Sequence, residues 1–328
     1  MKTHLTPNQP RILVIRRDNI GDLVCTTPLF ARLRHHFPQA HIAALVTEYN
    51  LPVLSGNPHL DAVFFYQKSK HRAENESWLG TYARRIALIF KLRQMRFDCV
   101  LLPGGPHPSA QRTAKLLGAS KIIVRTQTPP GAHEVECVLQ VCQDLGIHDT
   151  TPPPPTQLFP DPNALSKRLP QGKKTIGVHI SARKPAQRWS AEKFSELIGS
   201  LCTQGYRVVL FWSPGAEDNP LHPGDDNKAN TILTTLSGKP VIPMSTHTLS
   251  ELIAGLACCD AIICSDGGAM HLAAGLGKPI VCFFGNSAPQ RWRPWGVPHR
   301  VLQPASERVE DITVQEALTA FAHLMNTP

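Results

Sequence analysis

Short apolar runs alternate with stretches of helical periodicity along this chain, and the series occurs twice. The apolar runs have the composition of buried strands and are bounded by polar residues and turn formers. They cover residues 12–16, 41–46, 62–66, 99–102 and 121–124 in the first half and residues 175–180, 206–212 and 260–264 in the second. Helical stretches between them include residues 23–37, 133–145, 190–203, 249–257 and 270–276. This alternation predicts, in each half, a mostly parallel sheet covered on both faces.

A run of four prolines, Pro152–Pro155, separates the two series. Consecutive prolines form a stiff, extended segment, which is typical of a linker. The predicted fold class is therefore α/β, with two Rossmann-like domains at residues 1–155 and 156–328 that face each other across a cleft. In such folds, ligands bind at the carboxyl ends of the strands. A last helix is predicted within residues 309–325. The sequence leaves open whether this helix packs back on the first domain.

The chain is long enough for two domains of ordinary size, and none of its apolar runs approaches the length of a membrane span. Its first residues lead straight into a strand and lack the apolar core of a signal peptide. We therefore expect a soluble, cytoplasmic protein. The nine cysteines include no C-x-x-C pair and no cluster with histidine, which predicts reduced, buried thiols rather than disulfides or a zinc site.

Positive charge is concentrated in the first half of the chain. Residues 1–155 hold 18 lysines and arginines against 11 aspartates and glutamates, and the whole chain has a formal net charge of +9. Basic clusters at residues 68–72 and 84–96 suit an acidic partner such as nucleic acid, an anionic membrane surface or a phosphorylated glycolipid. The alternative for each cluster is a solvated helix face. Because no zinc-finger or RNP-like motif accompanies them, we do not expect a nucleic-acid partner.

The turn Asp266-Gly267-Gly268 joins a predicted strand to a predicted helix. Glycines there let the backbone approach a ligand closely, and the free N–H groups at the start of a helix favour an anion such as a pyrophosphate. His271, in the first helical turn, supplies a further donor. The alternative is an ordinary tight turn of an α/β domain.

Asp22 stands at the end of the first strand-to-helix loop, directly after Gly21. A carboxylate near a helix N-terminus remains ionised and can accept a proton from an incoming hydroxyl group. The alternative is a structural role, in which Asp22 caps the helix or acts as a first-turn acid.

The loop after the first strand of the second half carries three cations, Arg183, Lys184 and Arg188, together with the hydroxyl of Ser181. Arginine forks match phosphate oxygens and lysine adds a point charge, so the loop predicts a pyrophosphate clamp. The alternative is an exposed basic loop. Glu217 lies just past the next strand, where a carboxylate can bind the hydroxyl groups of a ribose. The alternative is that Glu217 is an acidic surface residue without a ligand.

Several motifs of nucleotide and hydrolytic enzymes are absent from the sequence. We find no GxGxxG after the first strand, no Walker GxxxxGK[ST] and no GxSxG elbow, which argues against nicotinamide enzymes, P-loop NTPases and serine hydrolases of that type. No DxD-like or His/Glu pattern indicates a metal. We therefore expect the cations of the Ser181 loop to neutralise a leaving group.

Taken together, several segments resemble glycosyltransferase family nine, the ADP-heptose:lipopolysaccharide heptosyltransferases. They are the run ILVIRRDNIGDLVCTTPL from Ile12, the pair Arg188-Trp189, the run SDGGAMHLAA from Ser265, and the shorter segments 133–136 and 145–147. The resemblance covers nearly the whole chain in the expected order. It implies a GT-B fold in which the N-terminal domain takes a lipid-linked acceptor and the C-terminal domain takes the nucleotide sugar. It also implies an inverting, metal-independent transfer to the lipopolysaccharide inner core.

The resemblance further implies roles for individual residues. Asp22 is then the general base that deprotonates the acceptor hydroxyl. The other implied roles are diphosphate binding by Gly267, Gly268 and His271, contact with the donor sugar by Asp266, ribose binding by Glu217, adenine binding by the His247 loop, further donor contact by Met270, and acceptor binding by Arg17 and Asn19. No cofactor is implied beyond the donor substrate ADP-heptose. The implied protein is a monomer that contacts the inner membrane peripherally at its cytoplasmic face.

One position departs from the family pattern. Several members have a lysine directly before the residue that matches Arg188, where it meets the phosphates, whereas this chain has Gln187. The positive charge then comes from Arg188, Lys184 or Arg183, and a different donor is an alternative. Further alternatives are a transferase with another nucleotide sugar or a protein acceptor, a non-catalytic nucleotide-binding module, and a sugar-nucleotide epimerase.

Overall fold

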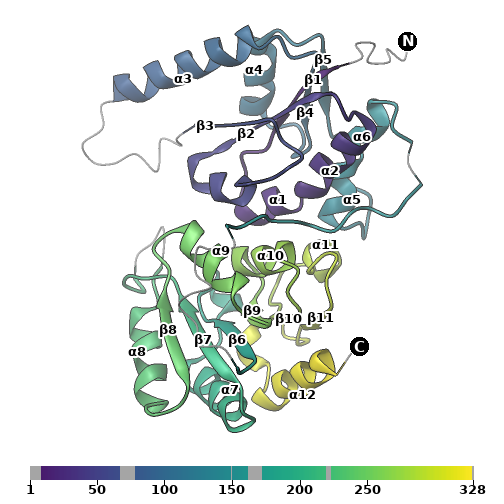
Figure 1. Cartoon of the computed structure of the whole chain (residues 1–328). Helices are drawn as coiled ribbons and strands as arrows, with labels where there is room; N and C mark the ends of the chain where they lie inside the picture. The colour runs from purple at the N-terminus through teal and green to yellow at the C-terminus, as the bar shows by residue number, and fades with distance from the viewer. Residues whose placement is uncertain (1–8, 67–77, 149, 162–171, 219–222, 327–328) are drawn as a thin grey trace. The chain divides into compact units, whose positions relative to one another are not determined.

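The computed structural model describes residues 9–66, 78–148, 150–161, 172–218 and 223–326, and it divides the chain into two compact units (Figure 1). The first unit is Met1–Leu158 and the second is Phe159–Pro328. The basic cluster at residues 68–72 lies outside the described residues. In the described part of the chain, no helix is both long enough and apolar enough to cross a bilayer.

The first unit contains a five-stranded sheet in the order β3-β2-β1-β4-β5, and every pairing in it is parallel. Its strands are β1 (Arg11–Ile15), β2 (His41–Thr47), β3 (Ala62–Tyr66), β4 (Cys99–Leu102) and β5 (Lys121–Val124). The middle strands are buried on both faces, as expected for a parallel sheet covered by helices. The five strands predicted in this half are confirmed.

Helices lie between these strands and after the last of them. They are α1 (Ile20–Val24), α2 (Thr27–His36), α3 (Trp78–Gln94), α4 (Pro108–Leu117), α5 (Glu134–Leu139) and α6 (Val141–Asp144), and a 3-10 helix, η1, covers Glu48–Leu54. The single helix predicted at 133–145 is wrong in one respect, because Gln140 separates α5 from α6.

The helix predicted at 23–37 is also two helices, and the reason is local. Pro28 has no N–H group to donate to the carbonyl of Val24, so a continuous helix cannot pass through it without losing that bond. Instead, Thr27 Oγ1 donates to Val24 O at 2.8 Å. The chain leaves α1 at Cys25 and starts α2 with the proline in its first turn, where a missing donor costs little.

The second unit contains a six-stranded, all-parallel sheet in the order β11-β10-β9-β6-β7-β8. Its strands are β6 (Thr175–His179), β7 (Arg207–Trp212), β8 (Val241–Ser245), β9 (Ala261–Ser265), β10 (Ile280–Phe283) and β11 (His299–Leu302). Sequence periodicity predicted β6, β7 and β9. It missed β8, β10 and β11. Strand β8 is an edge strand that contains Pro243, and proline interrupts the strand pattern and is tolerated only at sheet edges.

The helices of the second unit are α7 (Ala191–Thr203), α8 (Asp226–Thr235), α9 (Leu249–Ala257), α10 (Gly268–Gly275), α11 (Pro289–Trp292) and α12 (Val314–Met325), with 3-10 helices η3 (Pro185–Gln187) and η4 (Val309–Asp311). Side chains at their N-termini explain where several begin. The hydroxyl groups of Ser190, Thr248 and Thr313 each accept a hydrogen bond from a backbone N–H of the first turn. The C-terminal helix α12 packs against α7, β10 and β11.

The four-proline segment is attached to the first unit. Arg32 Nη2 in α2 donates to the carbonyl oxygens of Thr151 and Pro152, at 3.3 and 3.1 Å. The backbone N–H of Gln157 donates to Thr27 Oγ1 at 3.0 Å. These contacts tie the proline segment to the first compact unit, which ends at Leu158.

All nine cysteines are free thiols, and most of them are buried, as predicted. Burial raises the pKa of Cys99 and of Cys259 to about 12. These thiols are therefore protonated and unreactive at neutral pH.

Candidate functional site

The strand order defines a switch point in each sheet. In the first sheet the chain runs from β1 outward to β2 and β3 and then returns to β4 on the other side of β1. In the second sheet it runs from β6 to β7 and β8 and then returns to β9. Loops that leave the carboxyl ends of the two strands flanking such a point diverge and form a crevice, which is where α/β sheets bind ligands. The loop after β1 leads into helix α1, which carries Asp22, and the loops after β6 and β9 carry most residues of the predicted donor site.

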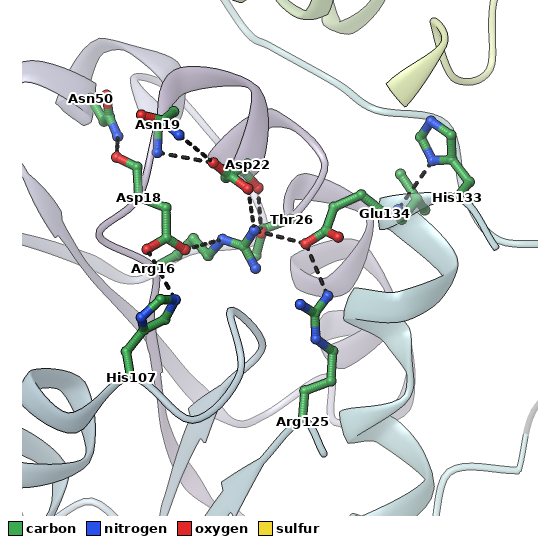
Figure 2. A network of polar contacts seen from close by, with 11 residues as sticks. Arg16, Asp18, Asn19, Asp22, Thr26, Asn50, His107, Arg125, His133 and Glu134 are labelled. Atoms are coloured by element: carbon green, nitrogen blue, oxygen red, sulfur yellow. Dashed lines mark hydrogen bonds and ion pairs between the residues drawn. The ribbon is translucent and has the colours of Figure 1, made fainter. Parts of the chain in front are cut away.

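Asp22 lies in the first turn of α1, and both of its carboxylate oxygens are bonded (Figure 2). Arg16 Nη2 donates to Asp22 Oδ1 at 2.7 Å. The backbone N–H and the side-chain Nδ2 of Asn19 both donate to Asp22 Oδ2 at 3.1 Å. The capping role, which the sequence left open as an alternative, is therefore confirmed. The Asp22 side chain nevertheless keeps 15% of its surface exposed.

Arg16 belongs to a buried charge network that links both ends of the first unit's sequence (Figure 2). Its side chain is only 2% exposed and contacts three carboxylates. Nη2 donates to Glu134 Oε1 at 2.8 Å as well as to Asp22, and Nε lies 3.0 Å from Asp18 Oδ2. Glu134, 1% exposed, also accepts a bond from Arg125 Nη1 at 2.9 Å. Buried charges require such pairing, because an unpaired one loses its hydration without compensation.

Burial by itself would lower the pKa of Arg16, but the carboxylates of Asp22, Asp18 and Glu134 outweigh it, so the pKa of Arg16 lies above its ordinary value. The guanidinium group is therefore permanently charged. It holds the Asp22 carboxylate in one orientation through a charge-assisted bond.

A pocket of about 200 Å³ opens beside this network, at the carboxyl ends of β1 and β4. Arg17, Asp18, Tyr66, His107 and Ser109 contribute its polar and aromatic lining. Gly104 also lines it, and an added Cβ there would lie 2.7 Å from Asp18 Oδ2. A larger residue at this position would therefore displace the Asp18 carboxylate, because the loop after β4 passes directly against the Arg16–Asp18 pair.

The two predicted acceptor residues, Arg17 and Asn19, differ from each other in position. Arg17 lines the pocket, where its guanidinium group donates to Ser109 Oγ at 3.0 Å and to Thr113 Oγ1 at 3.3 Å and lies 5.0 Å from the centre of the Tyr66 ring. Asn19 is occupied with Asp22. Arg17 is thus available to a ligand in the pocket, and Asn19 acts on the carboxylate of Asp22.

In the second unit, the loops after β6 and β9 are joined through Asp266. Gln187 Nε2 donates to Asp266 Oδ2 at 2.8 Å, and Ser287 Oγ donates to the same oxygen. Gln187 is 6% exposed. The residue that departs from the family pattern is therefore a buried donor that holds the side chain of Asp266.

Arg188 and Glu217 are paired with each other rather than standing as separate ligand groups. Arg188 Nη1 lies 2.5 Å from Glu217 Oε1, and its Nε donates to Ala182 O at 3.0 Å. Glu217 is 61% exposed. Because such exposed pairs contribute little to stability, the pair can open for a ligand at low cost.

The glycine turn begins α10 directly. Gly267 is exposed and has extended backbone geometry, and a Cβ at this position would meet nothing within 4 Å. Neither strain nor packing therefore requires glycine there, which leaves close approach of a ligand as a reason for it. Gly268 is the first residue of the helix. Met270 is fully buried, and His271 is 6% exposed with its ring 6.0 Å from that of Trp292.

The remaining predicted donor residues lie on loops of the second unit. Ser181 Oγ accepts a bond from the backbone N–H of Ser213 at 2.8 Å, which ties the loop after β6 to the loop after β7. Arg183 and Lys184 are exposed in the first of these loops. His247 is exposed and its N–H donates to Glu251 Oε2 at 2.8 Å.

Sequence reasoning missed the parts of the network that depend on distant partners. It assigned no role to Arg16, Arg125 or Glu134, although Arg16 directly follows the first strand and Glu134 lies in a segment that resembles the family. A charged residue at the start of an otherwise buried helix was the available signal. Within the described ranges, no group of three or more histidine, cysteine, aspartate or glutamate side chains is arranged to hold a metal ion.

Comparison with known proteins gives a consistent picture. The model of glycosyltransferase family 9 (heptosyltransferase) matches residues 106–319, which is more than half of the chain. The lipopolysaccharide heptosyltransferase 3 of Escherichia coli K12 is 27% identical over 304 residues, which cover 84% of this chain and 82% of that protein.

Two solved structures share the fold. The glycosyl transferase family 9 protein from Veillonella parvula DSM 2008 superposes with a TM-score of 0.81 at 20% identity, covering 99% of this chain and 98% of that one. The E. coli ADP-heptose lipopolysaccharide heptosyltransferase II superposes with a TM-score of 0.77 at 24% identity, covering 96% and 98%. With two all-parallel α/β units, these likenesses confirm the GT-B fold.

Proposed function

Because the chain belongs to glycosyltransferase family 9, the heptosyltransferase family, we propose that it transfers a heptose from ADP-heptose to the inner core of lipopolysaccharide. The reaction inverts the anomeric centre and requires no metal ion. The observation that carries this proposal is the position of Asp22 and of most predicted donor residues, which follow the strands β1, β6 and β9 that flank the switch point of each sheet.

Asp22 is the general base. Asp22 Oδ2 already accepts two hydrogen bonds, whereas Oδ1 accepts a single bond from Arg16 among the described residues. A carboxylate oxygen can accept about two bonds, so Oδ1 retains one acceptor position for the acceptor hydroxyl. The proton moves to Oδ1 as the hydroxyl oxygen attacks the anomeric carbon and the bond from that carbon to the diphosphate breaks.

The leaving ADP is held by the second unit. The N–H groups at the start of α10 and the exposed glycine before it suit a diphosphate. Arg183 and Lys184 are exposed on the loop after β6, and Arg188 is released from Glu217 when Glu217 binds the ribose. Asp266, held by Gln187, contacts the heptose. Met270 contributes packing beneath the turn, and the His247 loop faces the adenine.

The acceptor is a phosphorylated glycolipid, which agrees with the excess of lysine and arginine in residues 1–155. It enters the pocket lined by Arg17. Since lipid-linked acceptors are embedded in a bilayer, the enzyme works in peripheral contact with the cytoplasmic face of the inner membrane.

Replacement of Asp22 by Asn tests the base. The amide keeps an oxygen for Arg16, but it cannot take the proton, so we expect turnover to fall by roughly a hundredfold or more. Affinity for ADP, measured by calorimetry, should stay close to that of the unchanged protein. The measurement is release of ADP from ADP-heptose in the presence of acceptor, with EDTA present throughout.

Asp18→Asn is the matched control, since Asp18 also pairs with Arg16 but is not the base. We expect it to retain far more turnover than Asp22→Asn. Equal loss in both variants, or survival of turnover in Asp22→Asn, would show that the proton goes elsewhere.

A further inference from the structure

Helix α3 presents a row of large apolar side chains to solvent. Tyr82, Ile86 and Phe90 are 60%, 47% and 62% exposed, and their spacing of four residues places them along one side of the helix. The helix already packs through another side, where Leu92 is fully buried and Leu88 lies against the core of the first unit. A helix at a protein surface normally presents polar residues outward. The exposed row therefore indicates a surface that binds a partner.

Helices α3 and α4 themselves carry only positive charge. α3 and α4 pack side by side (Figure 1), and Arg93 Nη1 of α3 donates to the carbonyl of Leu116 in α4 at 3.4 Å. The two helices contain six cations and no aspartate or glutamate. The cations are Arg84, Arg85, Lys91, Arg93, Arg112 and Lys115. Leu116, 51% exposed, adds a further apolar side chain to this face.

Helix α3 also passes close to the candidate acceptor pocket. The guanidinium group of Arg85 lies 5.8 Å from the centre of the Tyr66 ring, and Tyr66 lines the pocket together with Arg17. The turn of α3 that carries Arg85 therefore lies near the pocket wall. A partner that covers α3 lies beside the pocket.

We propose that the outer face of α3 and α4 is a membrane-docking surface whose partner is a bilayer of anionic phospholipids. Tyr82, Ile86 and Phe90 enter the boundary between headgroups and acyl chains, and the surrounding lysines and arginines contact lipid phosphates. The bilayer then holds a lipid-linked acceptor beside the pocket. Only this last step rests on the proposed function.

Charge argues against the other occupants. Two copies of this face would bring cations against cations without a compensating carboxylate, which opposes self-association. Nucleic acid would satisfy the cations but would leave the aliphatic and aromatic row on α3 without an apolar environment. A bilayer with anionic headgroups satisfies both parts of the surface.

Sedimentation of the full chain with vesicles tests the proposal without any substrate. We expect binding to vesicles of equal parts phosphatidylcholine and phosphatidylglycerol and much weaker binding to phosphatidylcholine alone. Phe90→Ser should reduce the partition coefficient by roughly tenfold, because it removes one inserted ring. The matched control is Phe65→Ser. Phe65 is 46% exposed on β3 and faces the side of the sheet opposite to Phe64 and Tyr66, so this change should leave binding unaltered.

The charge component has its own pair of variants. Lys91→Gln with Lys115→Gln should lower the affinity for the anionic vesicles by roughly tenfold or more. Lys173→Gln with Lys174→Gln removes two equally exposed charges from the second unit and should have little effect. Added salt should weaken binding of the unchanged chain to anionic vesicles. It should also reduce the difference in vesicle affinity between the two double variants.

Circular dichroism of each variant confirms that it is folded. Equal loss from Phe90→Ser and Phe65→Ser overturns the proposal, and so does the absence of binding to anionic vesicles. A dimer in light scattering that Phe90→Ser dissolves, or tighter binding to DNA than to vesicles, assigns the face to another occupant and also overturns it. Transfer to a deacylated, water-soluble acceptor should survive in Phe90→Ser. If the unchanged chain binds anionic vesicles through this face but transfers to no acceptor, the docking surface stands and the proposed function fails.

Discussion

At the scale of single residues, the position of the candidate base depends on a buried glutamate more than one hundred positions away in sequence. Glu134 accepts hydrogen bonds from both Arg16 and Arg125 and is almost inaccessible to solvent. Its negative charge balances part of the positive charge of Arg16, which Asp22 and Asp18 would otherwise balance alone. The orientation of Asp22 therefore follows from a contact between the first loop of the chain and the start of α5.

Replacement of Glu134 by Gln should be costly. The change leaves two buried guanidinium groups with one carboxylate fewer, so we expect the free energy of unfolding to fall by about 3 kcal/mol. Chemical denaturation measures this. In the proposed reaction, kcat should fall more than the KM for the acceptor changes, because Arg16 would lose its fixed position beside Asp22.

Glu136→Gln is the control for that substitution. Glu136 is exposed on the same helix and accepts a bond from the backbone N–H of His133, which the carbonyl of a glutamine can also accept. We expect its stability to change by less than about 0.5 kcal/mol. A loss in Glu136→Gln as large as in Glu134→Gln would mean that the helix start, not the charge network, carries the effect.

At the scale of elements, the break between α1 and α2 positions the first site. Because Pro28 ends α1 after about one and a half turns, Asn19 and Asp22 lie on a short helix of their own rather than on a long one. Thr27 replaces the lost backbone bond and also accepts a bond from Gln157 beside the proline segment. One buried hydroxyl thus joins α1, α2 and the end of the first unit.

Thr27→Val removes that hydroxyl without changing the shape of the side chain. It leaves Val24 O and the N–H of Gln157 without this partner, so we expect a loss of about 1–2 kcal/mol in the free energy of unfolding. Thr27→Ser keeps the hydroxyl and should recover most of the loss. If serine is more destabilising than valine, then the methyl group rather than the hydrogen bonds stabilises the junction.

At the scale of the whole molecule, the chain consists of two α/β units with separate cores and separate switch points. The predicted donor residues all lie in the second unit, and the predicted base and acceptor residues all lie in the first. A nucleotide without a sugar or acceptor should therefore act on the second unit alone.

Hydrogen exchange with and without ADP measures this separation. At an ADP concentration about one hundred times its Kd, binding should stabilise the second unit by about 2.7 kcal/mol. We expect slower exchange at residues 266–271 and in the loop at 180–189, and unchanged exchange in β1 to β5. UDP should protect these amides less at the same concentration. Protection confined to the first unit, or equal protection by UDP, would contradict the assignment of an ADP site to the second unit.

The sequence by itself determined the kind of fold. Alternation of apolar strands with helices, repeated on both sides of Pro152–Pro155, predicted two parallel sheets, and the segments around Asp22 and Gly267 indicated the family. These signals are readable because they depend on residues that are neighbours along the chain. Strands β8, β10 and β11 were missed, β8 where Pro243 disturbs the pattern, and the two helices predicted at 23–37 and 133–145 were each divided.

Only the tertiary structure decided which charged and polar groups meet. Arg16 and Glu134 are 118 residues apart, and Gln187 and Asp266 are 79 residues apart. Their contacts exist because the strand order brings the loop after β1 near α5 and the loop after β6 next to the loop after β9. Periodicity reports the environment of a residue, buried or exposed, but it does not report the partner. The energy of a buried charge depends on that partner, so its role becomes visible only when the sheet is assembled.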